Sequence, residues 1–221
     1  MPNDNRDNYT DLFFAAVTIA CPSLTAANSV AAPVLKILLN LNEKRQKESK
    51  KILWEELRHV ANHERLAADP DGFVAKSARY YQAAMIGAAH KNLRILARLV
   101  VGHKSHPGFS ADDFLSFAGV IESLRGEELD VLAAFIKERQ RRELLKAIDL
   151  NSNYWPQIQS SLIHFSPDEL TAIASGLTRT GFIVAMPGLD GSSWNVTPIL
   201  LRLEQTVQFN DAIKISREEN G

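Results

Sequence analysis

The chain has 221 residues, of which 45% are hydrophobic and 23% are charged, and its formal net charge is −1. This balance is typical of a soluble globular protein and disfavours a globally basic nucleic-acid binder. The single cysteine, Cys21, excludes an internal disulfide and favours a reducing, cytoplasmic compartment. The chain is long enough to bury a sizeable core without disulfides.

An N-terminal run without charged residues, Leu12 to Leu35, raises the question of a membrane segment. A membrane-spanning helix needs about 20 predominantly apolar residues, but two prolines interrupt this run, and its acidic flank does not suit a signal peptide. We therefore predict two short alanine-rich helices, over residues 11–20 and 24–32, that pack in the core. The alternative is a membrane-acting effector that inserts its Leu12–Leu39 segment.

The first 150 residues predict one helix after another. Pro33 suits the start of a helix whose apolar periodicity resumes at Ile52 after a polar stretch, so this pattern indicates one long helix with a solvated middle or two helices in line. The next helix is predicted to run from Phe73 to Val101 and to end at Gly102. Further helices follow, and together they predict an α-helical bundle domain over residues 1–150.

Residues 151–221 predict a second, smaller domain that mixes helix and strand. Ser166 to Glu169 combines a capping serine, a proline at the first helical position and a glutamate that completes the capping box. The predicted elements are a helix to Thr180, a hairpin of Phe182–Met186 and Ser193–Val196, a helix opened by Thr197 and Pro198, and a polar tail that frays after Phe209. The predicted fold class is therefore mainly α, a helical bundle with a small C-terminal α+β segment that contains one β-hairpin.

This order of helix, strand, wing, strand and Thr-Pro resembles the second half of a winged-helix module. A winged helix that binds DNA would use the helix over residues 167–180, but this helix offers only Arg179, and residues 151–221 carry four basic and seven acidic side chains. Because phosphate contacts supply most nonspecific DNA affinity, we predict a protein contact for this segment rather than DNA. The residues that carry the resemblance are Leu170, Ile173, Leu177, Gly181–Val184, Gly188–Gly191 and Asn195–Pro198.

The whole chain is also similar, more loosely, to uncharacterised bacterial helical proteins associated with mobile elements or with phage defence of the abortive-infection type. Phe73–Val101 and Asp112–Glu128 carry this second likeness. It implies a regulatory or interaction role in such a setting, by association with the fold alone.

Glu56, His59 and His63 lie on one face of the predicted helix, at a spacing that can ligate a metal ion. Di-iron bundles need a second Glu-x-x-His unit, and zinc hydrolases use His-Glu-x-x-His, and the sequence contains neither. A solvated helix face is therefore the favoured interpretation, and a metal-dependent enzyme is the alternative. The sequence has no phosphate-binding loop or nucleophile motif, so we predict no catalytic residue and no cofactor.

One segment of the chain is cationic. Residues 71–105 sum to +5 and the rest of the chain sums to −6, which together give the net −1. Within this segment Lys91, Arg94 and Arg98 share one polar helix face. We predict that this stripe binds an anionic partner, unless acidic side chains of residues 106–150 neutralise it within the fold.

The leading hypothesis for function is a non-enzymatic interaction or regulatory protein. We expect it to self-associate as a homo-oligomer through the small residues at 15–32 and 83–89, which allow close helix approach, and to bind another protein.

Overall fold

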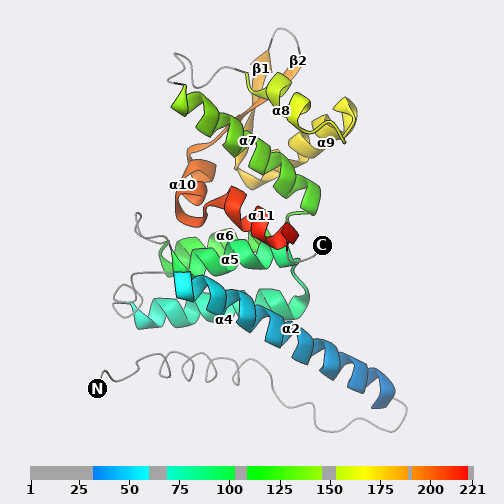
Figure 1. Cartoon of the computed structure of the whole chain (residues 1–221), viewed down its shortest axis with the longest axis vertical. Helices are drawn as coiled ribbons and strands as arrows, with labels where there is room; N and C mark the ends of the chain where they lie inside the picture. The colour runs from blue at the N-terminus through cyan, green and yellow to red at the C-terminus, as the bar shows by residue number, and fades with distance from the viewer. Residues whose placement is uncertain (1–31, 60–68, 103–108, 146–152, 189–190, 219–221) are drawn as a thin grey trace. The chain divides into compact units, whose positions relative to one another are not determined.

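The computed structural model describes residues 32–59, 69–102, 109–145, 153–188 and 191–218. These residues form a mainly helical fold with a two-stranded antiparallel hairpin near the C-terminus, which confirms the predicted fold class (Figure 1). The chain divides into two compact units, an N-terminal unit (residues 1–122) and a C-terminal unit (residues 123–221).

Helices alone form the described part of the N-terminal unit, and α2, α4 and α5 pack against one another pairwise. Helix α2 is continuous, which confirms one of the two predicted alternatives. Tyr80 is fully buried among these helices, and its hydroxyl donates a hydrogen bond to the carbonyl of Ser49 at 2.8 Å. The helices are α2 (Ala32–His59), α4 (Pro70–Ile86), α5 (His90–Val101) and α6 (Ala111–Ser123).

The prediction of one helix from Phe73 to Val101 is wrong, because the chain turns at Gly87. Gly87 adopts a left-handed conformation, with a φ of 96°, and its amide donates to the carbonyl of Ala84 at 3.2 Å. The guanidinium of Arg45 then donates to the carbonyl of Met85 at 2.8 Å and so satisfies a second carbonyl at the end of α4. Periodicity alone misses this break because the alanines around Gly87 are strong helix formers.

The small residues of α4 are used within the N-terminal unit. Ala83 and Ala84 are buried, and α4 packs on both α2 and α5. These two side chains are therefore not available to a second copy of the chain. The other predicted self-association surface, residues 15–32, lies almost wholly outside the described residues.

The C-terminal unit is built around α7 (Gly126–Leu144), which packs on α8, α9, α11 and β2. The core continues into the hairpin, where the rings of Trp155 and Trp194 lie 4.4 Å apart. The other elements are α8 (Trp155–Ser161), α9 (Pro167–Leu177), a 3-10 turn (Thr178–Thr180), β1 (Ile183–Gly188), β2 (Gly191–Val196), α10 (Pro198–Val207) and α11 (Phe209–Glu218).

The two units meet in sequence at residues 122 and 123, whereas the sequence pattern places the boundary at residue 150. The difference concerns α7, whose buried side contacts later elements. Phe135 of α7 is fully buried, and its ring lies 6.4 Å from that of Tyr154 and 6.3 Å from that of Trp155. After residue 150 the chain continues with two further helices, and the first strand begins only at Ile183.

The local helix signals of the C-terminal unit are confirmed. Ser166 Oγ accepts a hydrogen bond from the amide of Glu169, whose carboxylate accepts one from the amide of Ser166. Thr197 Oγ1 accepts likewise from the amide of Leu200, at the start of α10. Each cap needs only residues three apart in sequence, which is why the pattern reveals it.

The prediction that the tail frays after Phe209 is wrong, since these residues form α11. Phe209, Ala212 and Ile213 recur at helical spacing and are buried. The amide of Phe209 also donates to the Glu204 carboxylate at 2.6 Å, which satisfies an amide at the start of the helix.

We predict that Gly87→Ala lowers the free energy of unfolding by about 1–2 kcal/mol, because a side chain at this φ is strained and its Cβ would lie 3.1 Å from the Arg45 guanidinium. Urea unfolding followed by circular dichroism measures the loss. Gly119→Ala is the matched control. Gly119 lies within α6 with open space around its Cα, so alanine there should raise stability by about 0.5–1 kcal/mol. Equal effects of the two substitutions would contradict the account of Gly87.

Candidate functional site

The predicted anion-binding stripe is engaged in ion pairs inside the N-terminal unit. Arg94 donates to Glu56 and to Glu55, each at 2.9 Å, and Arg98 donates to Glu56 at 3.1 Å. The side chain of Arg94 is only 3% exposed. Lys91 is half-buried. The carboxylates in these pairs belong to α2, so Arg94 and Arg98 are engaged within the fold and do not stand on an open cationic face.

The same contacts bear on the predicted metal ligands. The Glu56 carboxylate already accepts hydrogen bonds from two guanidinium groups. His59 ends α2, and its side chain lies outside the described residues, as does the whole of His63. Within the described ranges, no group of three His, Cys, Asp or Glu side chains could hold a metal ion.

Most of the Leu12–Leu39 segment, which the membrane hypothesis needs, lies outside the described residues. Among the helices that are described, none combines the length and the apolar character that a membrane crossing requires.

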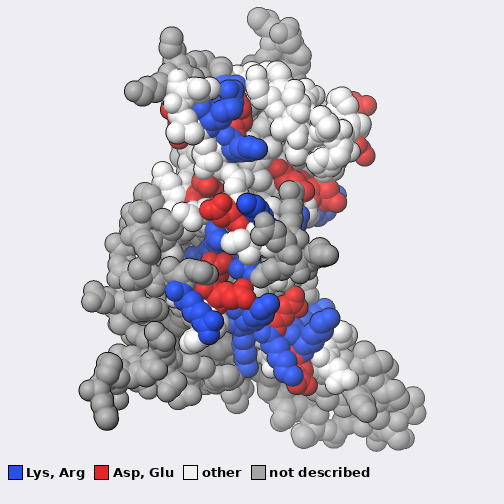
Figure 2. Space-filling model, in the orientation of Figure 1, with Lys and Arg blue, Asp and Glu red and all other residues white. Residues whose placement is uncertain are grey.

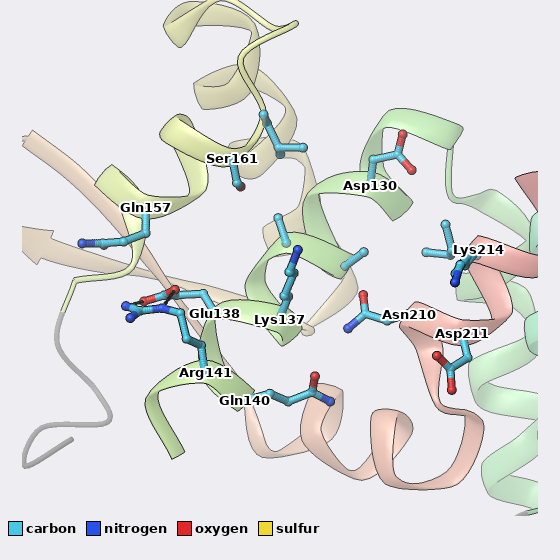
Figure 3. Close-up of a pocket in the computed structure, with 14 residues that line it drawn as sticks. Asp130, Lys137, Glu138, Gln140, Arg141, Gln157, Ser161, Asn210, Asp211 and Lys214 are labelled. Carbon is cyan, nitrogen blue, oxygen red and sulfur yellow. Dashed lines mark hydrogen bonds and ion pairs between the residues drawn. The ribbon is translucent and has the colours of Figure 1, made fainter. Parts of the chain in front are cut away.

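The C-terminal unit contains an open groove of about 700 Å³ between α7, α8 and α11. Figure 3 shows Lys137 projecting from α7 into this groove, with Ser161 on the α8 side and Asn210 and Lys214 on the α11 side. Four small or apolar side chains also line the groove. They are Ala133, Ala134, Leu162 and Ile213.

The groove carries charges of both signs in equal number. Its acidic residues are Asp130, Glu138 and Asp211, and its basic residues are Lys137, Arg141 and Lys214. Figure 2 likewise shows basic and acidic side chains interspersed on the face in view, rather than gathered in one continuous patch of either sign. The groove therefore suits a ligand that itself carries both polar and apolar groups.

Arg141 and Glu138 neutralise each other at one end of the groove. Glu138 accepts two hydrogen bonds from Arg141, at 2.7 and 2.8 Å, and one from Arg142 at 2.8 Å. These bonds, foremost those of Arg141, lower the pKa of Glu138 to about 2. By contrast, neither Lys137 nor Lys214 has an ion pair with another residue in the described part of the chain, and both are exposed. These two lysines are the cations that the groove can offer to a ligand.

Arg142 fixes one wall of the groove. Its guanidinium lies 4.3 Å from the ring centre of Tyr154 and donates to the carbonyl of Asn153 at 3.0 Å. Because Tyr154 directly precedes α8, this contact holds the start of α8 against α7.

The Arg179 side chain, which the sequence offers for DNA contact, is bound within the unit. Arg179 donates to Glu128 at 2.6 Å and 3.2 Å, and the Glu128 side chain is only 1% exposed. Burial alone would raise the pKa of Glu128, but the hydrogen bonds from Arg179 and from the Arg125 amide lower it below its usual range. The pair joins the start of α7 to the 3-10 turn that follows α9, and α9 itself contains no lysine or arginine.

Comparison of the chain with known protein families, with curated proteins and with solved structures finds no match. The groove is not among the sites that the sequence predicts. Its lining comes from α7 and from two elements later in the chain, α8 and α11, so no local sequence motif contains it.

We predict that Arg94→Glu lowers the free energy of unfolding by about 3 kcal/mol or more, because it places a third carboxylate beside Glu55 and Glu56 in the interior. Urea unfolding followed by circular dichroism measures the loss. Lys91→Glu makes the same change of charge on the same helix at a half-buried position, so it should cost less than about 1 kcal/mol. Similar losses for both variants would contradict a structural role specific to Arg94.

We predict that Glu138→Gln lowers stability by about 2 kcal/mol at pH 7, and that this difference narrows as the pH falls. The pKa of Glu138 is lowered in the fold to about 2, so its ionised form stabilises the fold above the ordinary value of 4.5, and this contribution is lost as the pH falls toward 2. Urea unfolding followed by tryptophan fluorescence measures this difference in stability. Both proteins carry Trp54→Phe, so that Trp155 and Trp194 report on the C-terminal unit alone.

Glu143→Gln is the control for this measurement, because Glu143 pairs with Arg139 on the same helix but is 49% exposed. Its effect should stay below about 0.5 kcal/mol at every pH. A Glu138→Gln difference that does not change between pH 7 and pH 3 would contradict the lowered pKa.

Proposed function

We propose that this chain is a non-enzymatic interaction protein and that the groove of its C-terminal unit receives an acidic, amphipathic segment of another protein. The observation that carries the proposal is the exposed pair Lys137 and Lys214 on two different helices, beside a lining of small and apolar side chains. An amphipathic segment would place its apolar side against Ala133 and Ala134 and its carboxylates against the two lysines.

The form of the groove favours a polypeptide over a small cofactor. Sites for small molecules bury most of their ligand's surface. This groove has exposed side chains along its rim, including Lys137, Gln140, Arg141 and Lys214, so it can cover only one side of a ligand. A peptide segment that is covered on one side by its own protein and on the other by the groove fits that geometry.

The charge balance favours a protein partner over a nucleic acid. A nucleic-acid site needs a surplus of basic side chains along a path of phosphates. Here three acidic side chains offset three basic ones, and Arg179 is held by Glu128. The succession of α7, α8, α9 and the hairpin supports a winged-helix-like arrangement for this unit, and we propose that it serves as a scaffold for protein contact.

Site-specific photo-crosslinking in the cells in which the chain is native tests this proposal. A photoreactive amino acid replaces Ser161, which lies in the groove and is exposed. We expect one discrete protein adduct, identified by mass spectrometry, and we expect Lys137→Glu with Lys214→Glu to reduce it at least tenfold. Because the looser resemblance is to phage-defence proteins, the experiment is run with and without phage infection.

Two controls make the result specific. The same photoreactive residue at Ala172, an exposed position on α9, should not give this adduct. Lys44→Glu with Lys47→Glu makes an identical change of charge on exposed lysines of α2 and should leave the adduct intact. An adduct to nucleic acid, or a protein adduct that survives the reversal of Lys137 and Lys214, would overturn the proposal.

A further inference from the structure

The groove of the C-terminal unit runs along α7 between two other helices. Near the end of α7, Arg142 donates to Gln157 at 3.4 Å, so the start of α8 lies there. Gln140 of α7 donates to the Glu204 carboxylate at 2.9 Å, and the same carboxylate accepts from the amide of Phe209, which begins α11. Both flanking helices therefore start beside the end of α7, and Figure 3 shows them extending from there in the opposite general direction along the groove.

An α-helix suits this groove better than an extended segment does. Extended peptides bind mainly by pairing their backbone with the edge of a sheet, and proline-rich peptides bind grooves lined by aromatic rings. The helices that line this groove use their backbone groups within themselves, and none of the described residues that line it is aromatic. A helix satisfies its own backbone hydrogen bonds, so it needs only side-chain contacts from the groove.

The face of α7 that lines the groove continues to an exposed leucine. Ala133, Lys137 and Arg141 of this face follow one another at intervals of four residues. Leu144 is two helical turns beyond Lys137, so it lies on the same face, and its side chain is 84% exposed. From Asp130, at the other end of this face, to Leu144 the helix rises about 21 Å, which matches a facing helix of about four turns.

Two alanines on this face leave room for a second helix. Ala133 and Ala134 are half-buried, and each side chain is only a methyl group. How closely two helices approach depends on the side chains at their contact, so a helix that lies over these alanines can come close to α7. Its acidic side chains then reach Lys137 and Lys214, which are exposed on α7 and α11.

We propose that the partner segment is an amphipathic α-helix of about four turns, which packs on α7 between α8 and α11 and covers Leu144. This inference rests on the proposed function of the groove, and it adds the form of the partner and one further contact residue. The partner helix places apolar side chains over Ala133 and Leu144, and it places carboxylates against Lys137 and Lys214.

Two synthetic peptides of about 15 residues test this form. Both have the same composition of leucine, glutamate and alanine. The helix isomer repeats its leucines at intervals of three and four residues, and the alternating isomer repeats them at every second position. Fluorescence anisotropy with the full chain at up to 500 µM measures both affinities. We expect the helix isomer to bind at least tenfold more tightly than the alternating isomer.

Variants of the chain test the residues. Leu144→Ala should weaken binding of the helix isomer at least about fivefold, because it removes apolar surface that the contact buries, and Lys137→Glu with Lys214→Glu should weaken it at least tenfold. Ile199→Ala is the control, since Ile199 is 45% exposed on α10 and lies outside the groove. It should leave the affinity unchanged. Alanine is a good helix former, so α7 is retained in Leu144→Ala, and circular dichroism checks this.

The outcomes separate this inference from the proposed function. Equal binding of the two isomers, tighter binding of the alternating isomer, or binding of neither overturns the helical form of the partner. Undiminished binding by a folded Leu144→Ala variant overturns the extension of the site to Leu144. The proposed function is judged separately, by the adduct formed from position Ser161. An adduct that depends on Lys137 and Lys214, together with a preference for the alternating isomer, leaves the proposed function standing and overturns only the helix.

Discussion

Three buried glutamates of this fold each pair with at least one arginine. This pairing determines the positions of the arginine side chains involved. The side chains of Glu56, Glu128 and Glu138 are each 8% exposed or less. An unpaired charge in such a place would cost several kcal/mol, and an arginine fork can satisfy both carboxylate oxygens at once. The arginines that pair with these three carboxylates are Arg94, Arg98, Arg141, Arg142 and Arg179.

This use of arginine limits what the surface can bind. A basic stripe has the same sequence whether it faces a partner or a buried carboxylate. Arg94 faces a buried carboxylate, that of Glu56. Exposed lysines remain available for binding, because a lysine is costly to bury fully. Lys137 and Lys214 are of this kind, and their separation on α7 and α11 defines a place for a carboxylate that no single helix would provide.

The sequence predicts the structural features that depend on residues close together in the chain. The cap of Ser166 with Glu169 and the hairpin ending at Val196 rest on residues a few positions apart, so the pattern reveals them. The pairing of Arg94 with Glu56 spans 38 positions and that of Arg179 with Glu128 spans 51, and periodicity carries no information on such partners. The sequence hides the break at Gly87 for a different reason: the alanines around this left-handed residue keep the average helix propensity high.

Helix α7 shows how one element can hold a unit together and still shape its surface. One side buries Leu132 and Phe135 in the core, and its Arg142 holds the residues that lead into α8. A neighbouring strip of the same helix supplies Ala133, Lys137 and Arg141 to the groove. The core side fixes the rotation of the helix about its axis, and that rotation fixes the direction of Lys137. The proposed partner would therefore meet a surface whose geometry the core already fixes. Binding then does not have to order α7, so the entropic cost of ordering that helix does not weaken the affinity.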